Sequence, residues 1–181
     1  LIKKNITLLH TRLAILDLDE RSNQPFKYKD SIVVFNGEIY NYLELKSQLE
    51  MMGASFQTSG DTEVVAVALD LWGDEAYSKF EGMWSLAYFN QKTMELSLSR
   101  DRFGEKPLYI FENDDGLFFA SELNALSKIS NQKFEINTNH LKRYLINGYK
   151  SLYKTKDTFF NKVSFLDKAS LIQIDTLGQK T

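Results

Sequence analysis

The sequence of 181 residues contains no cysteine and only two histidines and two prolines. Without cysteine the chain forms no disulfide, offers no thiolate ligand to a metal ion and holds no cysteine nucleophile. The two histidines, His10 and His140, are too few and too far apart in the sequence to build a metal site. We therefore expect neither a metal centre nor a cysteine-based reaction from these residues alone.

Excess charge and long apolar runs are absent as well. The formal net charge is −2 and the basic residues are scattered, which argues against nucleic acid as a partner. No apolar run approaches the roughly 20 residues that span a bilayer, and no signal peptide is evident, so we expect no membrane association and a cytoplasmic location. Hydrophobic residues make up 43% of the chain and aromatic residues 13%, enough for the core of one domain.

Hydrophobic periodicity predicts strands in two groups, with helices between them. Two hairpins are indicated, one over 83–100 and one over 108–119, each with polar turn residues at its centre. This order favours two antiparallel sheets covered by helices, an α+β class, over a parallel βαβ sheet. Further strands are predicted at 6–9, 31–35, 56–58 and 170–174, and helices at 38–52, 64–72, 121–129 and 140–146.

The most informative stretch runs from Val33 to Asn41 and contains Asn36-Gly37. Asn-Gly between apolar residues is typical of a tight turn, because both residues tolerate positive φ. Here the chain continues into a helical pattern instead of returning as a strand. A corner at this place would expose the Asn36 amide and the Gly37 N–H, the two donors that an oxyanion hole requires. A plain turn is the competing interpretation.

Several short motifs stand in a fixed order along the chain, and together they are far more specific than any one of them. The ordered set resembles the class II glutamine amidotransferase domain, of the N-terminal-nucleophile hydrolase type, of glutamine-dependent asparagine synthetases. The motifs FNGEIYN (35–41) and RDRFGEKPLY (100–109) separate this branch from amidophosphoribosyl- and glucosamine-phosphate-type amidotransferases. The motifs are HTRLAI (10–15), NQP (23–25), FNGEIYN (35–41), SGDTE (59–63), EGMW (81–84), RDRFGEKPLY (100–109) and ASE (120–122).

The resemblance implies a four-layer αββα sandwich that hydrolyses L-glutamine and passes ammonia to a C-terminal synthetase domain using ATP and Mg²⁺. It implies a cysteine nucleophile at the mature N-terminus, with its own α-amine as general base. This sequence holds no such cysteine. We therefore expect a sandwich incomplete at its N-terminus, no cofactor in this chain and no activity from it alone. The amidotransferase domain is expected over 1–150, with its last strands and exit over 151–181, and a homodimer is a further expectation.

Site residues follow from the same resemblance. Asn36 and Gly37 match the oxyanion pair. Arg12 matches the arginine that holds the substrate α-carboxylate, a role suited to its bidentate fork, whereas a structural ion pair is the alternative. Asp61, assisted by the Gly60 backbone, matches the carboxylate that binds the α-ammonium, and an ordinary helix N-cap is the alternative.

Three weaker assignments complete the substrate site. Glu38 is expected to help hold the α-ammonium, with a first-turn helical glutamate as the alternative. Leu13 and Ile15 are expected to supply backbone carbonyls, while their side chains belong to the core. His10 is expected to be packed and hydrogen-bonded and not a base, and the 100–109 stretch is expected to be structural and to face the synthetase domain.

Three rival functions are compatible with the resemblance. The chain could be a degenerate scaffold in a glutamine-independent synthetase of the β-lactam-forming type, an amidotransferase acting on another acceptor such as a sugar acid, or a stand-alone binding module. The complete set of Arg12, Asn36, Gly37 and Asp61 argues against a scaffold, because a scaffold needs no clamp for an amino acid.

Overall fold

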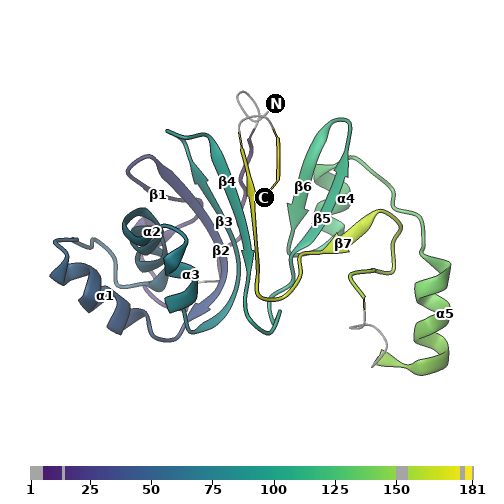
Figure 1. The fold of residues 1–181 in the computed structure, drawn as a ribbon, viewed down its shortest axis with the longest axis horizontal. Helices are drawn as coiled ribbons and strands as arrows, with labels where there is room; N and C mark the ends of the chain where they lie inside the picture. Colours follow the sequence, from purple (N-terminus) through teal and green to yellow (C-terminus); the bar gives the residue numbers. More distant parts are fainter. Residues whose placement is uncertain (1–5, 14, 150–154, 176–177, 181) are drawn as a thin grey trace.

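A computed structural model describes residues 6–13, 15–149, 155–175 and 178–180. Its strands form two antiparallel sheets that lie face to face, with helices on the outer face of each (Figure 1). This is the predicted four-layer αββα sandwich of the α+β class. The strands are β1 (Phe26–Tyr28), β2 (Ser31–Ile39), β3 (Gly82–Asn90), β4 (Glu95–Arg100), β5 (Tyr109–Asn113), β6 (Gly116–Ala120), β7 (Val163–Phe165) and β8 (Ser170–Ile174). The helices are η1 (Glu20–Ser22), α1 (Tyr42–Met51), α2 (Asp61–Trp72), α3 (Glu75–Lys79), α4 (Leu123–Ile129) and α5 (Thr138–Asn147).

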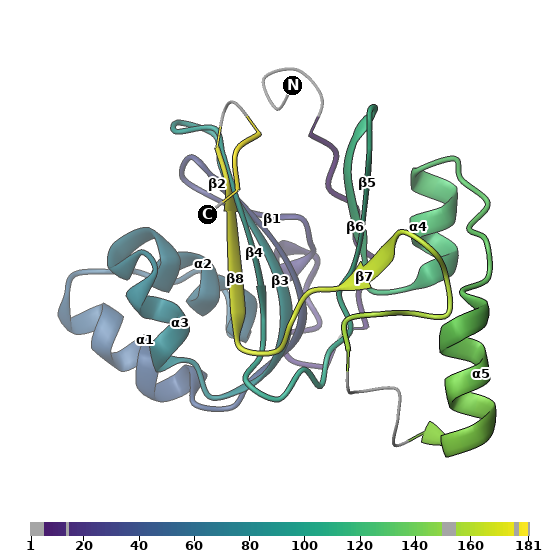
Figure 2. The same ribbon diagram turned by 45° about the vertical axis from the view of Figure 1, so that its right-hand side comes forward.

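The first sheet has the strand order β1-β2-β3-β4-β8, and the second has the order β6-β5-β7. Helices α1, α2 and α3 cover the outer face of the first sheet, and α4 covers the second (Figures 1 and 2). Helix α5 continues beyond α4, away from both sheets (Figure 2). Strands β7 and β8 both come from the stretch after residue 150, so that stretch contributes to each sheet. The domain boundary expected at 150 stays a prediction.

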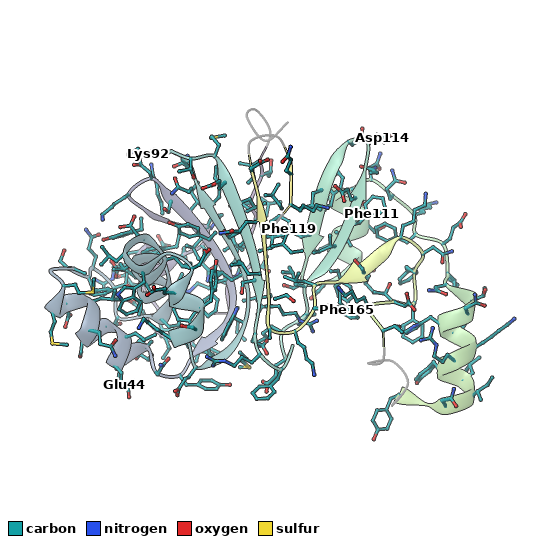
Figure 3. The ribbon with its side chains drawn as sticks, in the orientation of Figure 1. Glu44, Lys92, Phe111, Asp114, Phe119 and Phe165 are labelled. Carbon is teal, nitrogen blue, oxygen red and sulfur yellow. The ribbon has the colours of Figure 1, made fainter. Side chains whose placement is uncertain are left out.

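Three apolar clusters hold the layers together, and strand alternation assigns side chains to them. Val33, Phe35 and Ile39 point from β2 toward the helices and join the buried residues of α2. Val34 points the other way, into the cluster between the sheets, where Phe119 also lies (Figure 3). Phe111 packs in the third cluster, between the second sheet and α4 (Figure 3).

Most predicted elements are confirmed, including both hairpins, the strand at 170–174 and the helix that Gly73 ends. The helix over 140–146 begins slightly earlier, because Asn137 caps it by accepting a hydrogen bond from the His140 N–H at 3.0 Å. Two predicted strands are wrong. Residues 6–9 pair with no strand in the described part of the chain, and at 56–58 the backbone N–H groups bond to a side chain instead of a strand. Four short elements, η1, β1, α3 and β7, were missed.

Candidate functional site

Strand β2 runs straight through Asn36-Gly37, so the predicted corner is wrong. Asn36 lies opposite Ser85 and Gly37 opposite Trp84, and the pairing with β3 continues to Ile39. The helix begins only at Tyr42, with Asn41 as its N-cap residue. Glu38 is therefore a strand residue, and its alternative reading as a first-turn helical glutamate is wrong.

Close approach of the two strands, and not positive φ, requires glycine at position 37. A Cβ atom added to Gly37 would lie 2.1 Å from the Met83 carbonyl oxygen and 2.8 Å from the Trp84 Cα. Both contacts are with backbone, which cannot swing aside as a side chain can. The glycine therefore serves the packing of β2 against β3 and leaves its own backbone groups free for another use.

The N–H of Gly37 points away from β3. In an antiparallel pair, successive residues direct their backbone groups alternately toward and away from the neighbouring strand. Phe35 directs both groups away, because its N–H donates to Gln24 Oε1 at 2.6 Å and its C=O accepts from Gln24 Nε2 at 2.9 Å. Ile39 also points away, and its N–H donates to Asp61 Oδ2 at 3.0 Å. Gly37 lies between them in a continuous register, and among the described residues no acceptor bonds to its N–H.

The Asn36 side chain lies on the face of β2 that meets the second sheet. Its Nδ2 donates to the Ser121 hydroxyl oxygen at 3.2 Å, directly after the end of β6. The predicted helix over 121–129 begins slightly later, at Leu123, with Glu122 as its N-cap residue. The hydroxyl of Ser121 instead fixes Asn36. The half-buried Asn36 amide, on the face of β2, and the Gly37 N–H, at its open edge, thus come from adjacent residues.

Asp61 is buried and begins helix α2, whose N-cap residue is Gly60. The alternative reading of Asp61 as the N-cap itself is therefore wrong. Burial raises the pKa of Asp61 to about 6, and the charge of nearby Glu38 adds to this, while the Ile39 N–H opposes it. A carboxylate whose hydration is this incomplete gains much from a cationic ligand.

Arg12 is hydrogen-bonded to its own loop. Nη1 donates to the Asp19 carbonyl at 3.0 Å and to Asn23 Oδ1 at 3.2 Å. Nη2 donates to the Leu16 carbonyl at 2.8 Å and to that of Asp17. The guanidinium therefore holds the 16–23 loop through neutral oxygen atoms. Within the described residues it has no ion pair, so the alternative of a structural salt bridge is not what the geometry shows.

Two further carboxylates bring the Arg12 loop and the start of α2 together. Asp17 Oδ2 accepts from the Ser59 N–H at 2.7 Å, next to Gly60. Glu63 accepts from the N–H groups of Gln57 at 3.0 Å and Thr58 at 2.6 Å, as a first-turn glutamate reaching back over its helix start. Arg12 and Asp61 are in this way attached to one connected framework.

The remaining predicted residues are placed differently. Leu13 is 83% exposed and Ile15 is 63% exposed, so the expectation that their side chains belong to the core is wrong. Their carbonyl roles stay predictions. His10 is half-buried, and this burial lowers its pKa, with Arg12 acting in the same direction and the Phe35 carbonyl against it. Gly60 is buried beside Asp17, and its role toward substrate also stays a prediction.

Sequence reasoning missed Asp17, Gln24, Glu63 and Ser121. Gln24 stands in the NQP motif, whose sequence gives it no role, and Glu63 stands where a capping pattern places a glutamate. Two hollows on the described part of the surface, of about 390 and 610 Å³, are lined by none of Arg12, Asn36 and Asp61, and the second is lined in part by Ser121. Among the described residues there is no group of three potential metal ligands, and no helix long and apolar enough to cross a membrane.

Two facing antiparallel sheets between helical layers are the fold of the N-terminal-nucleophile hydrolase type. The structure is similar to the glutamine phosphoribosylpyrophosphate amidotransferase of Bacillus subtilis, with a TM-score of 0.64 and 21% identity over 95% of this chain and 33% of that one. It is also similar to an allosteric regulatory enzyme of purine biosynthesis, with a TM-score of 0.58 and 21% identity over 83% of this chain and 28% of that one. At these identities the likeness shows the fold alone.

The family model described as "Glutamine amidotransferase domain" matches residues 1–181, and the chain belongs to this family. It is 38% identical over 154 residues to asparagine synthetase [glutamine-hydrolyzing] 1 of Bacillus subtilis, covering 84% of this chain and 24% of that protein. It is 36% identical over 163 residues to a putative asparagine synthetase [glutamine-hydrolyzing] 2 of Methanocaldococcus jannaschii, covering 80% of this chain and 31% of that protein. The chain thus spans a quarter to a third of the length of these relatives.

Proposed function

We propose that this chain binds L-glutamine and supports its hydrolysis as the ammonia-supplying part of a glutamine-hydrolysing asparagine synthetase, which makes asparagine from aspartate, glutamine and ATP. The observation that carries the proposal is the edge of β2. There the Gly37 N–H points away from β3 with no acceptor among the described residues, next to the Asn36 amide and two residues before the N–H that Asp61 binds. The names of the relatives support the choice of acceptor.

Asn36 and Gly37 would form the oxyanion hole. Nδ2 of Asn36 carries two hydrogens, so donation of one to Ser121 leaves the other for the substrate. Together with the Gly37 N–H it would bind the oxygen of the tetrahedral intermediate, and each donor would contribute roughly 3 kcal/mol. Because both belong to a strand paired along its length with β3, they need no rearrangement as charge develops.

The two ends of the amino acid would be held by charges of opposite sign. Asp61 would accept the α-ammonium, with help from Glu38 and the Gly60 backbone. Arg12 would bind the α-carboxylate, and Leu13 and Ile15 would offer carbonyl oxygens. All four Nη hydrogens of Arg12 already have acceptors in its loop, so the carboxylate would bind through Nε or displace a loop carbonyl.

The nucleophile would be a cysteine at the mature N-terminus, with its α-amine as general base. No cysteine is present in these 181 residues, and the chain alone is expected to be inactive. ATP and Mg²⁺ would serve a separate synthetase domain, which receives the ammonia and is the expected partner of this one.

One observation favours a second candidate. The saturation of the Arg12 terminal nitrogens by loop oxygens is also what a scaffold domain, with no substrate to hold, would show. In that case the domain would belong to a glutamine-independent synthetase, and the full-length protein would release no ammonia from glutamine.

The test is ammonia release from glutamine by the full-length protein and its Asn36→Ala variant. Loss of one oxyanion donor is expected to lower kcat by roughly 10²–10³ with the KM for glutamine little changed. A variant with near wild-type kcat would show that Asn36 has a purely structural role. A wild-type protein without glutamine-dependent ammonia release would favour the scaffold.

Asn41→Ala is the matched control, because Asn41 is the other asparagine of the same motif. Its side chain donates to the Lys79 carbonyl at 2.9 Å and accepts from the Glu81 N–H at 3.0 Å. Both partners come just before β3, so these contacts lie on the β3 side of β2 and not at its open edge. Its loss is expected to lower the thermal unfolding midpoint while kcat stays within about threefold of wild type.

A further inference from the structure

The carboxamide of Gln24 takes the place of a strand beside β2. Strand β1 pairs with β2 only as far as Phe26 opposite Val33. Continuing this register would place position 24 opposite Phe35, but β1 begins only at Phe26, directly after Pro25. The Gln24 side chain bonds the Phe35 backbone instead, accepting its N–H at 2.6 Å and donating to its C=O at 2.9 Å. A primary amide offers the same donor and acceptor as a peptide group.

This contact lies one residue before the donors of the proposed oxyanion hole. On its other side, β2 is fixed by β3, which pairs Asn36 with Ser85 and Gly37 with Trp84. At the open edge, Gln24 fixes Phe35 and Asp61 fixes Ile39, so the backbone is held on both sides of Gly37. Gln24 Nε2 also lies 3.5 Å from the Thr62 hydroxyl, next to Asp61.

We infer that Gln24 is a positioning residue that orients the Asn36 and Gly37 donors by holding the Phe35 peptide in the plane of the sheet. The inference rests on the proposed function. Gln24 touches no reacting atom, so its contribution is to the geometry of the transition-state contacts and not to substrate affinity. Oxyanion donors stabilise the transition state only when they lie within a few tenths of an ångström of the required position. Release of the Phe35 peptide is therefore expected to lower kcat.

The decisive measurement is the split between kcat and KM in the full-length protein carrying Gln24→Met. Methionine fills about the same space but neither accepts from the Phe35 N–H nor donates to its C=O. We expect kcat to fall by about 10- to 100-fold while the KM for glutamine changes by less than about threefold. Gln173→Met is the matched control, because Gln173 donates to the Asp74 carboxylate at the surface, at 3.0 and 3.1 Å. It is expected to leave both constants unchanged.

Gln24→Glu supplies a second test that is independent of how well methionine packs. Ionised glutamate still accepts from the Phe35 N–H but repels the Phe35 carbonyl, whereas protonated glutamate restores the missing donor. The kcat of Gln24→Glu, divided by that of wild type at the same pH, is therefore expected to rise as the pH falls from about 8 toward 5. His10, Glu38, Asp61 and the charge of Arg12 also face this edge and are present in both proteins, so the ratio at each pH compares the two proteins in the same surroundings.

The outcomes separate the inference from the proposed function. A wild type that releases ammonia, with a folded Gln24→Met variant of unchanged kcat, overturns the inference alone, and so does a rise in KM at constant kcat. A pH-independent kcat ratio for Gln24→Glu also counts against it. A wild type that releases no ammonia overturns the proposed function, and the positioning role falls with it.

Discussion

At the scale of single residues, Asp61 is the most informative side chain of the site. It is 6% exposed, and its backbone contacts do not compensate fully for the lost hydration, so its pKa rises to about 6. Since this pKa is higher in the folded than in the unfolded chain, the folded state binds the proton more tightly. The favourable contribution to stability is then complete below about pH 4 and is lost as the pH rises through 6.

This pKa predicts how glutamine affinity depends on pH. The α-ammonium needs the ionised carboxylate, and at pH 5 about one Asp61 in ten is ionised if its pKa is about 6. The KM for glutamine of the full-length enzyme is expected to rise about tenfold between pH 8 and pH 5. In Asp61→Asn the KM should be high at every pH and nearly flat. A flat profile in the wild type would contradict the assignment of Asp61 to the ammonium.

The residues that position the site were harder to predict than those proposed to touch the substrate. Arg12, Asn36 and Asp61 stand in short motifs, and a motif can be matched without knowing the fold. Asp17 and Ser121 act through contacts with Ser59 and Asn36, which are 42 and 85 residues away in the sequence. No local pattern encodes such contacts, because they exist only once the strands and loops have assembled.

At the scale of elements, β2 shows how local turn chemistry is overridden. Asn-Gly favours a turn in a short hairpin, but β3 offers backbone groups along the whole of 31–39, and extended pairing satisfies more of them than a corner would. The helix therefore begins only at Tyr42. Hydrophobic alternation located the strand correctly, and the error concerned only where it ends.

Gly37→Ala tests the close approach of β2 and β3. The new Cβ would lie within 3 Å of backbone atoms of both Met83 and Trp84, so the pairing must open at the site. We expect a loss of at least about 3 kcal/mol of stability or no soluble protein, measured by thermal unfolding and yield.

Gly60→Ala is the control for this substitution. The nearest atom to its Cβ would be the Asp17 Cβ at 3.6 Å, an ordinary contact, and Gly60 has negative φ. The cost should be about 1 kcal/mol or less, the difference between glycine and alanine at an N-cap. Equal stability of the two variants would show that β2 can shift away from β3 at little cost.

At the scale of the whole molecule, the αββα arrangement was predictable because hairpin signals are local and antiparallel sheets follow from them. The short strands β1 and β7 were not predictable, since each has three residues and is defined by its neighbours, β2 and β5.

The buried residue Asp101 links two strands at one end of the first sheet. Its backbone N–H donates to the Trp84 carbonyl at 3.0 Å and its carbonyl accepts from the Ala169 N–H at 2.8 Å, which ties β3 to the entry of β8.

The Asp101 carboxylate is expected to be an acid-sensitive link between β3 and β8. Burial alone would raise its pKa, but the N–H groups of Glu105, Lys106, Phe103 and Trp84 outweigh burial and lower it. Asp101→Asn replaces one acceptor oxygen by a donor and should cost about 2–4 kcal/mol at pH 7.

The sign of the pH effect follows from the lowered pKa. The stabilisation is present above the unfolded value near 3.8 and disappears as the pH falls through the folded value, so the gap between wild type and Asp101→Asn should narrow steadily as the pH falls below about 4. Asp114→Asn, in the exposed β5–β6 turn, should show no gap at any pH. Thermal unfolding midpoints between pH 3 and 8 measure both, and a gap that persists in acid would assign the loss to packing.

The glycines of β2 and β3 predict which positions stay unchanged as related sequences diverge. A side chain on Gly82 would meet the Glu38 carbonyl oxygen at 2.0 Å, just as one on Gly37 would meet that of Met83. By contrast, nothing lies within 4 Å of the Cβ positions at Gly53, Gly73 and Gly148, where only the positive φ favours glycine. A side chain at such a turn strains only the local backbone, with ψ of −136° at Gly73 and −169° at Gly148, and displaces no neighbouring strand, so lineages are expected to lose these turn glycines more readily than Gly37 and Gly82. Glycine at positions 37 and 82 should then identify the relatives that keep this strand edge, and it should do so more reliably than overall percentage identity.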